Sequence, residues 1–214
     1  MSRAICENAR VAGTTAEGTR PRRPRGDTAQ RILDVAEGLA QVRGFNAFSY
    51  GDVAAELAIT TASLHYHFAG KAELGHALVA RYADRFARAL ATIDERSATA
   101  PEKLAAYARL YSDVLDDERM CLCGMLAAEY QTLPAEVGQA VVAFFDDNES
   151  WLERVLDAGH GAGTLRFEAS ARETARLLIG DLEGAMLLAR LYGDRGRFGA
   201  ATERLISTVA VAGD

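Results

Sequence analysis

Two cysteines one residue apart, Cys121 and Cys123, are the side chains best suited to covalent chemistry in this sequence. Thiolates are nucleophiles, and free helix amides or a neighbouring cation lower a thiol pKa. Because the pair follows Arg119 at the expected junction of two helices, we expect a lowered pKa and a Cys121 that is sensitive to oxidants or electrophiles, resolved by Cys123 or Cys6. The alternative is structural, since free cysteine is often a small buried residue at a helix junction.

The histidines and glycines do not form a metal, nucleotide or catalytic motif. His65 and His67 are two residues apart and so point to different sides of a helix, and His76 and His160 lack the spacing of a zinc site. The glycines of segment 159–163 follow a helical pattern, which indicates a helix stop. Neither Gly-x-Ser-x-Gly nor His-Glu-x-x-His occurs. The sequence therefore predicts no metal, no cofactor and no enzymatic activity.

Side chains between residues 57 and 74 have the pattern of a DNA-reading surface. Thr60 is placed to cap a short helix that buries Leu64 and Phe68, four residues apart. The helical period turns four side chains outward: Thr61, Ala62, His65 and Tyr66. A helix face with small side chains at its start and aromatic side chains further along fits the major groove of DNA.

Positions around this short helix are expected to contact DNA phosphates. Lys71 begins the next helix, and free backbone amides lie at the helix starts near Ser49 and Thr60. A pair of short helices also occurs as simple packing, so the pattern alone leaves both interpretations open.

The elements that must position these residues are helical. Ser49 and Asp52 have the form of a capping box, and Asp27 or Thr28 is placed to cap the first helix. Residues 58–60 form a three-residue turn of the helix-turn-helix type. The pattern predicts helices over about 28–43, 50–57 and 61–68, then a long amphipathic helix from residue 71.

The rest of the chain also has helical periodicity, and no alternating segment indicates a strand. Further helices are expected over about 101–119, 125–131, 137–158, 170–192 and 198–211. The predicted fold class is all-α, with about nine helices.

Length and composition suit a globular chain. Its 214 residues are 49% hydrophobic and 25% charged, enough for one large or two small domains. The longest apolar stretch, Ala140 to Phe145, is far shorter than the roughly 18 residues of a membrane span. The N-terminus has no secretory pattern. We therefore expect a cytoplasmic protein with no membrane partner.

The net charge of −6 is unevenly distributed. Residues 1–27 carry a net charge of +3, residues 28–75 of −2, and the remaining residues of −7. Most acidic residues therefore lie outside the expected DNA-reading segment. Residues 1–26 are rich in Arg, Pro and Gly and have no apolar periodicity. We interpret them as a disordered basic arm that either contacts phosphates or is simply solvated.

Residues 28–74 resemble the DNA-binding domain of the TetR/AcrR family of transcriptional regulators. The family's turn, aromatic helix end and Lys-x-x-Leu appear here as Ala58-Ile59-Thr60, Leu64-His65-Tyr66-His67-Phe68 and Lys71-Ala72-Glu73-Leu74. The match covers about a fifth of the chain, and His65 stands where the family usually has tyrosine. Residues 121–129 also resemble the NemR branch, which senses electrophiles, and this places the sensing cysteine at Cys121.

The resemblance implies a homodimeric regulator whose third helix reads palindromic, double-stranded operator DNA. It divides the chain into the arm (1–26), a helix-turn-helix domain (27–75) and an effector-binding and dimerisation domain (76–214). We expect a repressor that a small molecule, such as an electrophile, or cysteine modification releases from DNA. An activator or ligand-independent DNA-binding module stays open, as does a helical small-molecule binding protein or enzyme. The implied DNA contacts are Ser49, Tyr50, Thr60, Thr61, Ala62, Ser63, His65, Tyr66, His67 and Lys71.

Two more residue sets follow from the helix patterns. An apolar stripe indicates a dimer interface or, equally, an intramolecular core: Leu178, Leu182, Ala185, Ala189 and Tyr192. Side chains that lie on the helices around the expected effector pocket, each also typical of core, are Tyr107, Tyr111, Met125, Tyr130, Phe144, Trp151 and Met186.

Overall fold

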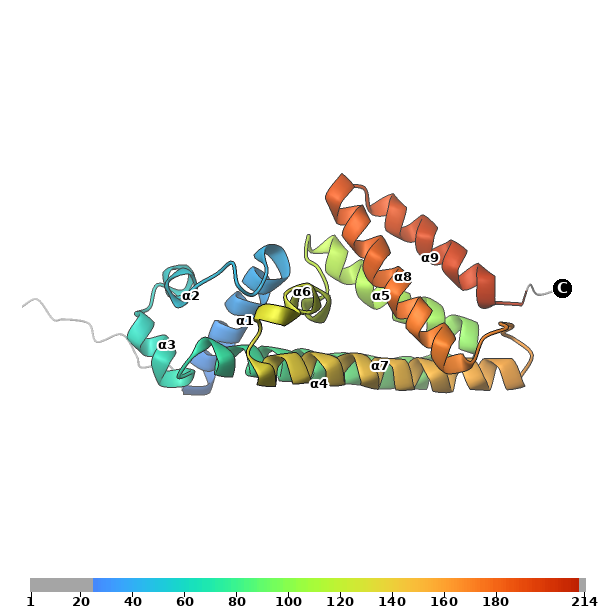
Figure 1. Cartoon of the computed structure of the whole chain (residues 1–214), viewed down its shortest axis with the longest axis horizontal. Coiled ribbons are helices and arrows are strands. Elements are labelled where there is room, and N and C mark those ends of the chain that lie inside the picture. The colour runs from blue at the N-terminus through green and yellow to red at the C-terminus, as the bar shows by residue number, and fades with distance from the viewer. Residues whose placement is uncertain (1–24, 212–214) are drawn as a thin grey trace, which may run out of the picture.

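The structure, a computed structural model, describes residues 25–211 and is helical almost throughout this range (Figure 1). Its α-helices are α1 (Arg25–Arg43), α2 (Tyr50–Leu57), α3 (Thr61–His67), α4 (Lys71–Arg96), α5 (Ala100–Asp116), α6 (Leu122–Ala128), α7 (Ala135–Gly161), α8 (Ala171–Tyr192) and α9 (Arg195–Val209). A short 3-10 turn, Tyr130–Thr132, follows α6. Between residues 25 and 211 there is no strand, only one isolated β-bridge. The predicted all-α fold is confirmed.

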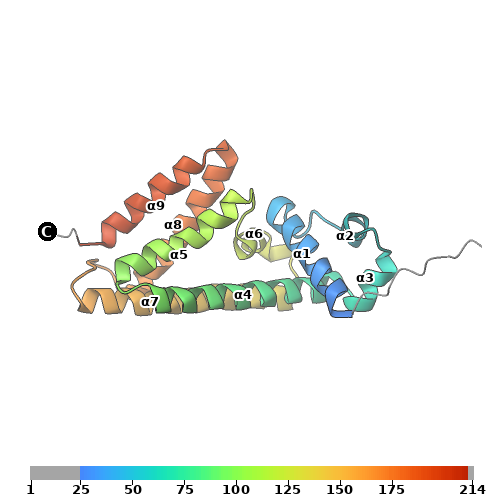
Figure 2. The same cartoon turned by 180° about the vertical axis from the view of Figure 1, so that it is seen from behind.

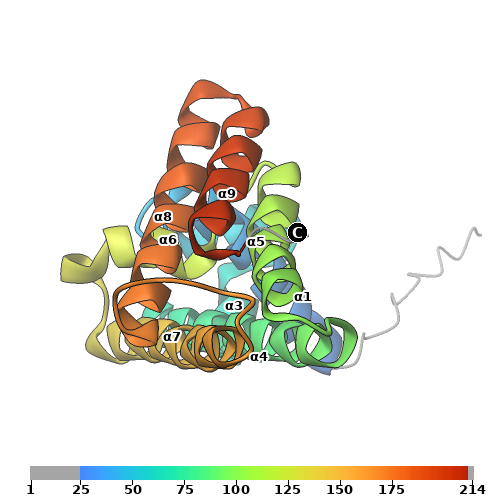
Figure 3. The ribbon, with the colours of Figure 1, turned by 90° about the vertical axis from the view of Figure 1, so that its right-hand side faces the viewer.

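The helices form two layers and a separate end. Helices α4 and α7 lie side by side along the length of the molecule, while α1, α2 and α3 occupy one end (Figures 1 and 2). Seen along the long axis, α5, α8 and α9 stack on the α4–α7 layer (Figure 3). None of the described helices has both the length and the apolar character needed to cross a bilayer.

Side-chain caps define several helix starts. Ser49 with Asp52, and Ser170 with Glu173, form capping boxes in which each partner satisfies a backbone amide of the other. The first helix differs from the prediction, because α1 begins at Arg25 and Asp27 lies in its first turn. There the carboxylate is still placed favourably near the positive end of the helix dipole.

The end that carries α1 to α3 is fastened to the remainder through α1. Glu37, almost fully buried, accepts hydrogen bonds from Arg81 and Arg85 of α4, at 2.6 and 2.5 Å. Gln41 donates through Nε2 to the carbonyl of Met120 at 2.9 Å, and the Met120 amide donates back to the Gln41 carbonyl. Because Glu37 and Gln41 are buried, these bonds hold α1 in a defined relation to the body of the molecule.

Candidate nucleic-acid interface and effector domain

The turn between α2 and α3 holds these two short helices at a fixed angle. Ala58 has a left-handed backbone with φ of 53°, a conformation uncommon for a residue other than glycine. The amide of Ile59 donates to the carbonyl of Ala54 at 3.0 Å. Thr60 caps α3, its Oγ1 accepting from the Ser63 amide at 3.2 Å. The predicted helix-turn-helix and its caps are confirmed.

The face of α3 that the pattern turned outward is exposed in the structure. Leu64 is completely buried, and Phe68 closes the inner side of the helix. Ser63 and His67 are half-buried at the edges. The side chains that reach solvent are Thr61, Ala62, His65 and Tyr66. Since α3 lies at the far end of the molecule (Figure 1), this face is sterically open to a partner as broad as a DNA duplex.

Tyr50 and His65 are largely engaged within the domain. The Tyr50 hydroxyl donates to the Phe68 carbonyl at 3.0 Å, and burial, with nearby Glu73, raises its pKa to about 12. The Tyr50 ring lies 4.8 Å from the imidazole of His65. His65 Nδ1 lies 3.1 Å from the Ala69 carbonyl, so it must donate there and leave Nε2 for an external partner. Tyr50 thus positions α3, and its expected contact with DNA stays a prediction.

Lys71 makes contacts within the chain that the sequence pattern did not predict. Its ammonium donates to the Phe48 carbonyl and lies over the rings of Phe45 and Phe48, 4.8 and 4.3 Å from their centroids. Desolvation lowers the pKa of Lys71, and Glu129 and Asp52 oppose this effect. In this conformation the ammonium fastens the start of α4 to the loop after α1. A phosphate contact by Lys71 stays a prediction.

The two cysteines are buried, and the expected lowering of their pKa is wrong. Cys121 is 1% exposed and Cys123 is fully buried, which raises the pKa of both thiols well above its usual range. The neighbouring carboxylate of Glu183 raises both further. The Gly124 amide donates to Cys121 Sγ at 3.4 Å, as expected at a helix start, but its opposing effect is smaller. Tertiary burial therefore outweighs the helix terminus. Cys6, the alternative resolving partner, lies outside the described residues.

Glu183 is a half-buried acid, with a buried carboxylate oxygen, that no sequence pattern indicated. It approaches the start of α6 so closely that a Cβ on Gly124 would lie 2.2 Å from its Oε2. Its Oε1 is buried without a hydrogen-bond partner in the described structure. Burial raises the pKa of Glu183 to about 7, and a hydrogen bond with Cys121 opposes that shift. Only the folded chain brings α8 and α6 together here, so no local signal pointed to this residue.

Most of the residues expected around an effector pocket form the aromatic core instead. Tyr107 stacks on Trp151, with centroids 5.6 Å apart, and its hydroxyl donates to Asn148 Oδ1 at 3.2 Å. Tyr111, Phe144 and Met186 are also buried, whereas Met125 is half-buried and Tyr130 is exposed.

The apolar stripe expected on α8 faces the interior of the chain. Leu178, Leu182 and Ala189 are at most 4% exposed, because α8 packs on both α7 and α9. Ala185 is half-buried, and Tyr192 alone of the stripe is exposed. The buried part of the stripe therefore belongs to the core of the chain, which is the alternative that the pattern had left open. The opposite side of α8 carries a second apolar face, which comprises Leu177, Gly180, Gly184, Leu187, Leu188 and Leu191.

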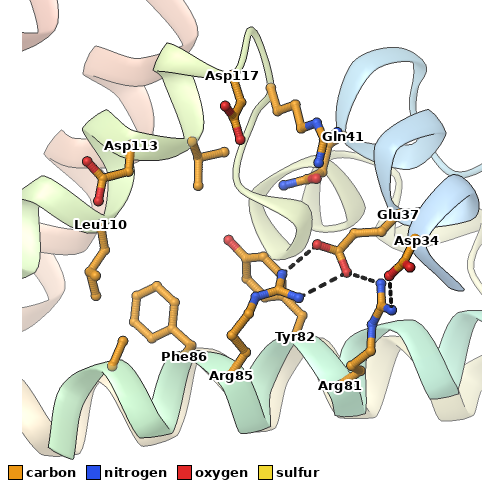
Figure 4. Close-up of a pocket in the computed structure, with 13 residues that line it drawn as sticks. Asp34, Glu37, Gln41, Arg81, Tyr82, Arg85, Phe86, Leu110, Asp113 and Asp117 are labelled. Atoms are coloured by element: carbon orange, nitrogen blue, oxygen red, sulfur yellow. Dashed lines mark hydrogen bonds and ion pairs between the residues drawn. The ribbon is translucent and has the colours of Figure 1, made fainter. Parts of the chain in front are cut away.

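A cavity of about 510 Å³ opens between α1, α4 and α5 (Figure 4). Gln41 and Glu37 enter it from α1, Tyr82 and Phe86 from α4, and Asp113 from α5. The helix patterns of the sequence did not predict this cavity. The sequence feature that could have indicated it is the spacing of charged residues. The acids Asp34 and Glu37 are three residues apart, and the arginines that pair with them, Arg81 and Arg85, are four apart.

Comparisons with known proteins agree with this architecture. Residues 32–78 match the family described as bacterial regulatory proteins, tetR family, and residues 100–205 match the family described as tetracyclin repressor-like, C-terminal domain. No curated protein matches the chain.

Solved structures are similar over nearly their whole length. A TetR family transcriptional regulator from Agrobacterium tumefaciens is 32% identical, with a TM-score of 0.84 over 87% of this chain and 99% of that chain. A TetR transcriptional regulator from Legionella pneumophila is 36% identical, with a TM-score of 0.78 over 85% and 97%. The reduced form of NemR from E. coli is 22% identical, with a TM-score of 0.75 over 86% and 98%, and so shares the fold.

Proposed function

The chain belongs to the TetR family of transcriptional regulators, and we propose that it is a dimeric repressor in the cytoplasm that a small molecule releases from its operator. Each protomer would place α3 in the major groove of one half of a palindromic site. The observation that carries this proposal is the exposed face of α3, mounted on a capped and hydrogen-bonded turn at the far end of the molecule. In this scheme the DNA-binding domain spans residues 27–75 and the effector and dimerisation domain residues 76–214.

Within this proposal the start of α3 lies nearest to the bases. Thr61 and Ala62 are short and exposed, so the helix can approach the floor of the groove closely. Tyr66 and Nε2 of His65 lie further along, where they can reach base edges or phosphates. The free amides at the start of α2, next to Ser49, are placed for a phosphate. Residues 1–24 of the basic arm lie outside the described part of the chain, whereas Arg25 and Gly26 begin α1.

The second apolar face of α8 is the surface we assign to the dimer. Leu177 and Leu191 are 62% and 73% exposed, more than a stable monomer needs to leave uncovered on one helix. Gly180 and Gly184 lie between them with open space where a Cβ would be, so another helix can approach closely. A second copy of this chain fits the surface because the same stripe is self-complementary across a two-fold axis.

A bound small molecule is a better supported trigger than thiol modification. Cys121 and Cys123 are buried, and the pKa of each thiol is raised. Both effects slow attack on an electrophile. A ligand needs only a cavity whose shape differs between the DNA-bound and free states.

The test is a gel shift on the DNA upstream of the gene, with two alanine-to-glutamate variants. Ala62→Glu places a carboxylate on the exposed face of α3, and Ala91→Glu makes the same change on an exposed position of α4. We expect wild type and Ala91→Glu to bind alike and Ala62→Glu to bind at least tenfold more weakly. Equal binding by all three would contradict the assignment of α3. Transcription from the adjacent promoter, measured with the operator occupied, separates a repressor from an activator.

A further inference from the structure

We propose that the cavity between α1, α4 and α5 is a binding site for a small organic cation that carries N–H donors on an apolar body. The cavity lies between the DNA-binding end of the molecule and its body (Figure 4). Its regulatory consequence rests on the proposed function, whereas the binding itself does not.

The walls of the cavity combine an apolar surface with acids. Phe86 of α4 and Leu110 and Val114 of α5 provide the apolar part. Asp113 and Asp117 are four residues apart, so they lie on one side of the chain, and both line the cavity (Figure 4). Within residues 25–211 neither carboxylate has a hydrogen bond or ion pair, and both residues are exposed where they line the cavity.

An unused acceptor lies on the α1 side of the cavity. Gln41 is only 2% exposed, and its Nε2 is engaged by the Met120 carbonyl. Its Oε1 is buried and has no hydrogen-bond partner in the described structure. A buried amide oxygen without a donor is destabilising, so a ligand N–H at this point is favoured. The cavity therefore presents acceptors on two opposite walls.

The charges that remain available favour a cation. Arg81 and Arg85 are already paired with Asp34 and Glu37. Arg119 also lines the cavity and adds one positive charge, against the two carboxylates of α5. An ammonium at these carboxylates, with its apolar body on Phe86 and Leu110, pairs with the acids and covers the apolar surface, whereas an anion of the same shape meets two unpaired acids.

Occupancy would couple to DNA binding through α1. A ligand that contacts Gln41 and Asp113 together ties α1 to α5, and α1 packs directly on α2 of the helix-turn-helix. Because the two copies of α3 must match the spacing of two half-sites, a restraint on α1 changes the free energy of operator binding.

Binding is tested by calorimetry with three probes of one shape. Phenethylammonium carries charge and N–H donors, trimethyl(2-phenylethyl)ammonium carries charge without donors, and phenylacetate carries the opposite charge. We expect phenethylammonium to bind wild type at least tenfold more tightly than phenylacetate and at least fivefold more tightly than the quaternary ion. Equal affinity for phenylacetate overturns the proposed cation site, and equal affinity for the quaternary ion overturns the proposed need for N–H donors.

Variants locate the site. Asp113→Asn with Asp117→Asn should weaken phenethylammonium binding at least tenfold. Asp146→Asn with Asp147→Asn, the same change at exposed positions of α7, should leave it unaltered. Ala89→Phe, which fills the cavity from α4 without removing a polar group, should also abolish binding. Unaltered binding to either cavity variant, with the helical circular dichroism signal retained, overturns the assignment.

Coupling is measured separately. Saturating phenethylammonium should change the operator dissociation constant of wild type at least fivefold, and operator should change the affinity for the amine by the same factor. If the amine binds and operator affinity is constant, the regulatory role is overturned and the site stands. If the chain binds no operator DNA at all, the proposed function fails, and the calorimetry still decides the site.

Discussion

Arg190 of α8 donates a hydrogen bond from its guanidinium to the main-chain carbonyl of Gln41 in α1, at 3.2 Å. The same guanidinium donates to the carbonyl of Val42. These carbonyls belong to the last turn of α1 and so lack partners within that helix. A cation at this end also opposes the negative end of the helix dipole. One side chain therefore links α8, which carries the proposed dimer surface, to the helix on which the DNA-binding end is mounted.

Replacing this arginine should lower stability. Arg190→Ala leaves the two carbonyls partly buried without a charged donor, so we expect the free energy of unfolding to fall by about 1–2 kcal/mol. Arg190→Lys keeps the charge but loses the planar group with two donors. Its free energy of unfolding should lie between those of wild type and Arg190→Ala. Urea denaturation measures both. Arg204→Ala, at an exposed position of α9, is the control and should change little; a loss as large as that of Arg190→Ala would refute the capping role.

Lys71→Met separates a structural lysine from a phosphate contact. Methionine retains the apolar stem but removes the ammonium from the Phe48 carbonyl and from the rings of Phe45 and Phe48. We expect stability to fall by about 1–2 kcal/mol, while the slope of log operator affinity against log salt stays constant. A slope that becomes shallower by about one phosphate would instead establish the contact predicted from the sequence.

Glu183 should make stability fall as pH rises through the neutral range. Its pKa is about 7 in the folded chain, against 4.5 for the unperturbed acid, so the folded state binds more protons between these values. Stability should therefore decrease from about pH 4.5 to about pH 7 and level off above. Glu183→Gln removes this dependence and should stabilise the protein at pH 8 by an amount on the order of 2 kcal/mol. Urea midpoints at pH 5.5 and 8 test it, and an equal pH dependence in the variant would contradict the role of this carboxyl.

The buried thiols should react slowly. In a Cys6→Ser background, we expect N-ethylmaleimide to label Cys121 and Cys123 at least 100-fold more slowly in the native state than in urea, because both thiol burial and a raised pKa oppose attack. Mass spectrometry of timed aliquots gives both rates. Rapid native labelling near neutral pH would restore the sensing role predicted from the sequence.

Gly184→Leu should disrupt the dimer and leave the protomer folded. The new side chain enters open space in the single chain, so it meets no clash there, but it prevents close approach of a second α8. Light scattering coupled to size exclusion should show a shift toward monomer. Gly161→Leu, also directed into open space but at the end of α7, should remain dimeric. A dimeric Gly184→Leu variant would mean that the copies associate elsewhere.

The spacing of residues close together in the sequence was sufficient to predict the structure of the DNA-binding end. Thr60 as a cap, Leu64 and Phe68 as the inner side of α3, and the exposed Thr61 and Ala62 all depend on neighbours within a few residues, whose geometry the helical period dictates. The fold class followed from the same periodicity.

Tertiary structure alone decided the features that join distant segments. Periodicity identified an apolar side of α8 but not that α7 and α9 cover it, so the exposed leucines were missed. The pKa of Cys121 depends on burial and on Glu183, 62 positions along the chain, and not on the helix start beside it. The ammonium of Lys71 and the acceptor of Gln41 likewise find their surroundings across helices. Desolvation and charge pairing act through space, whereas a sequence pattern reports only what lies within a few turns of one helix.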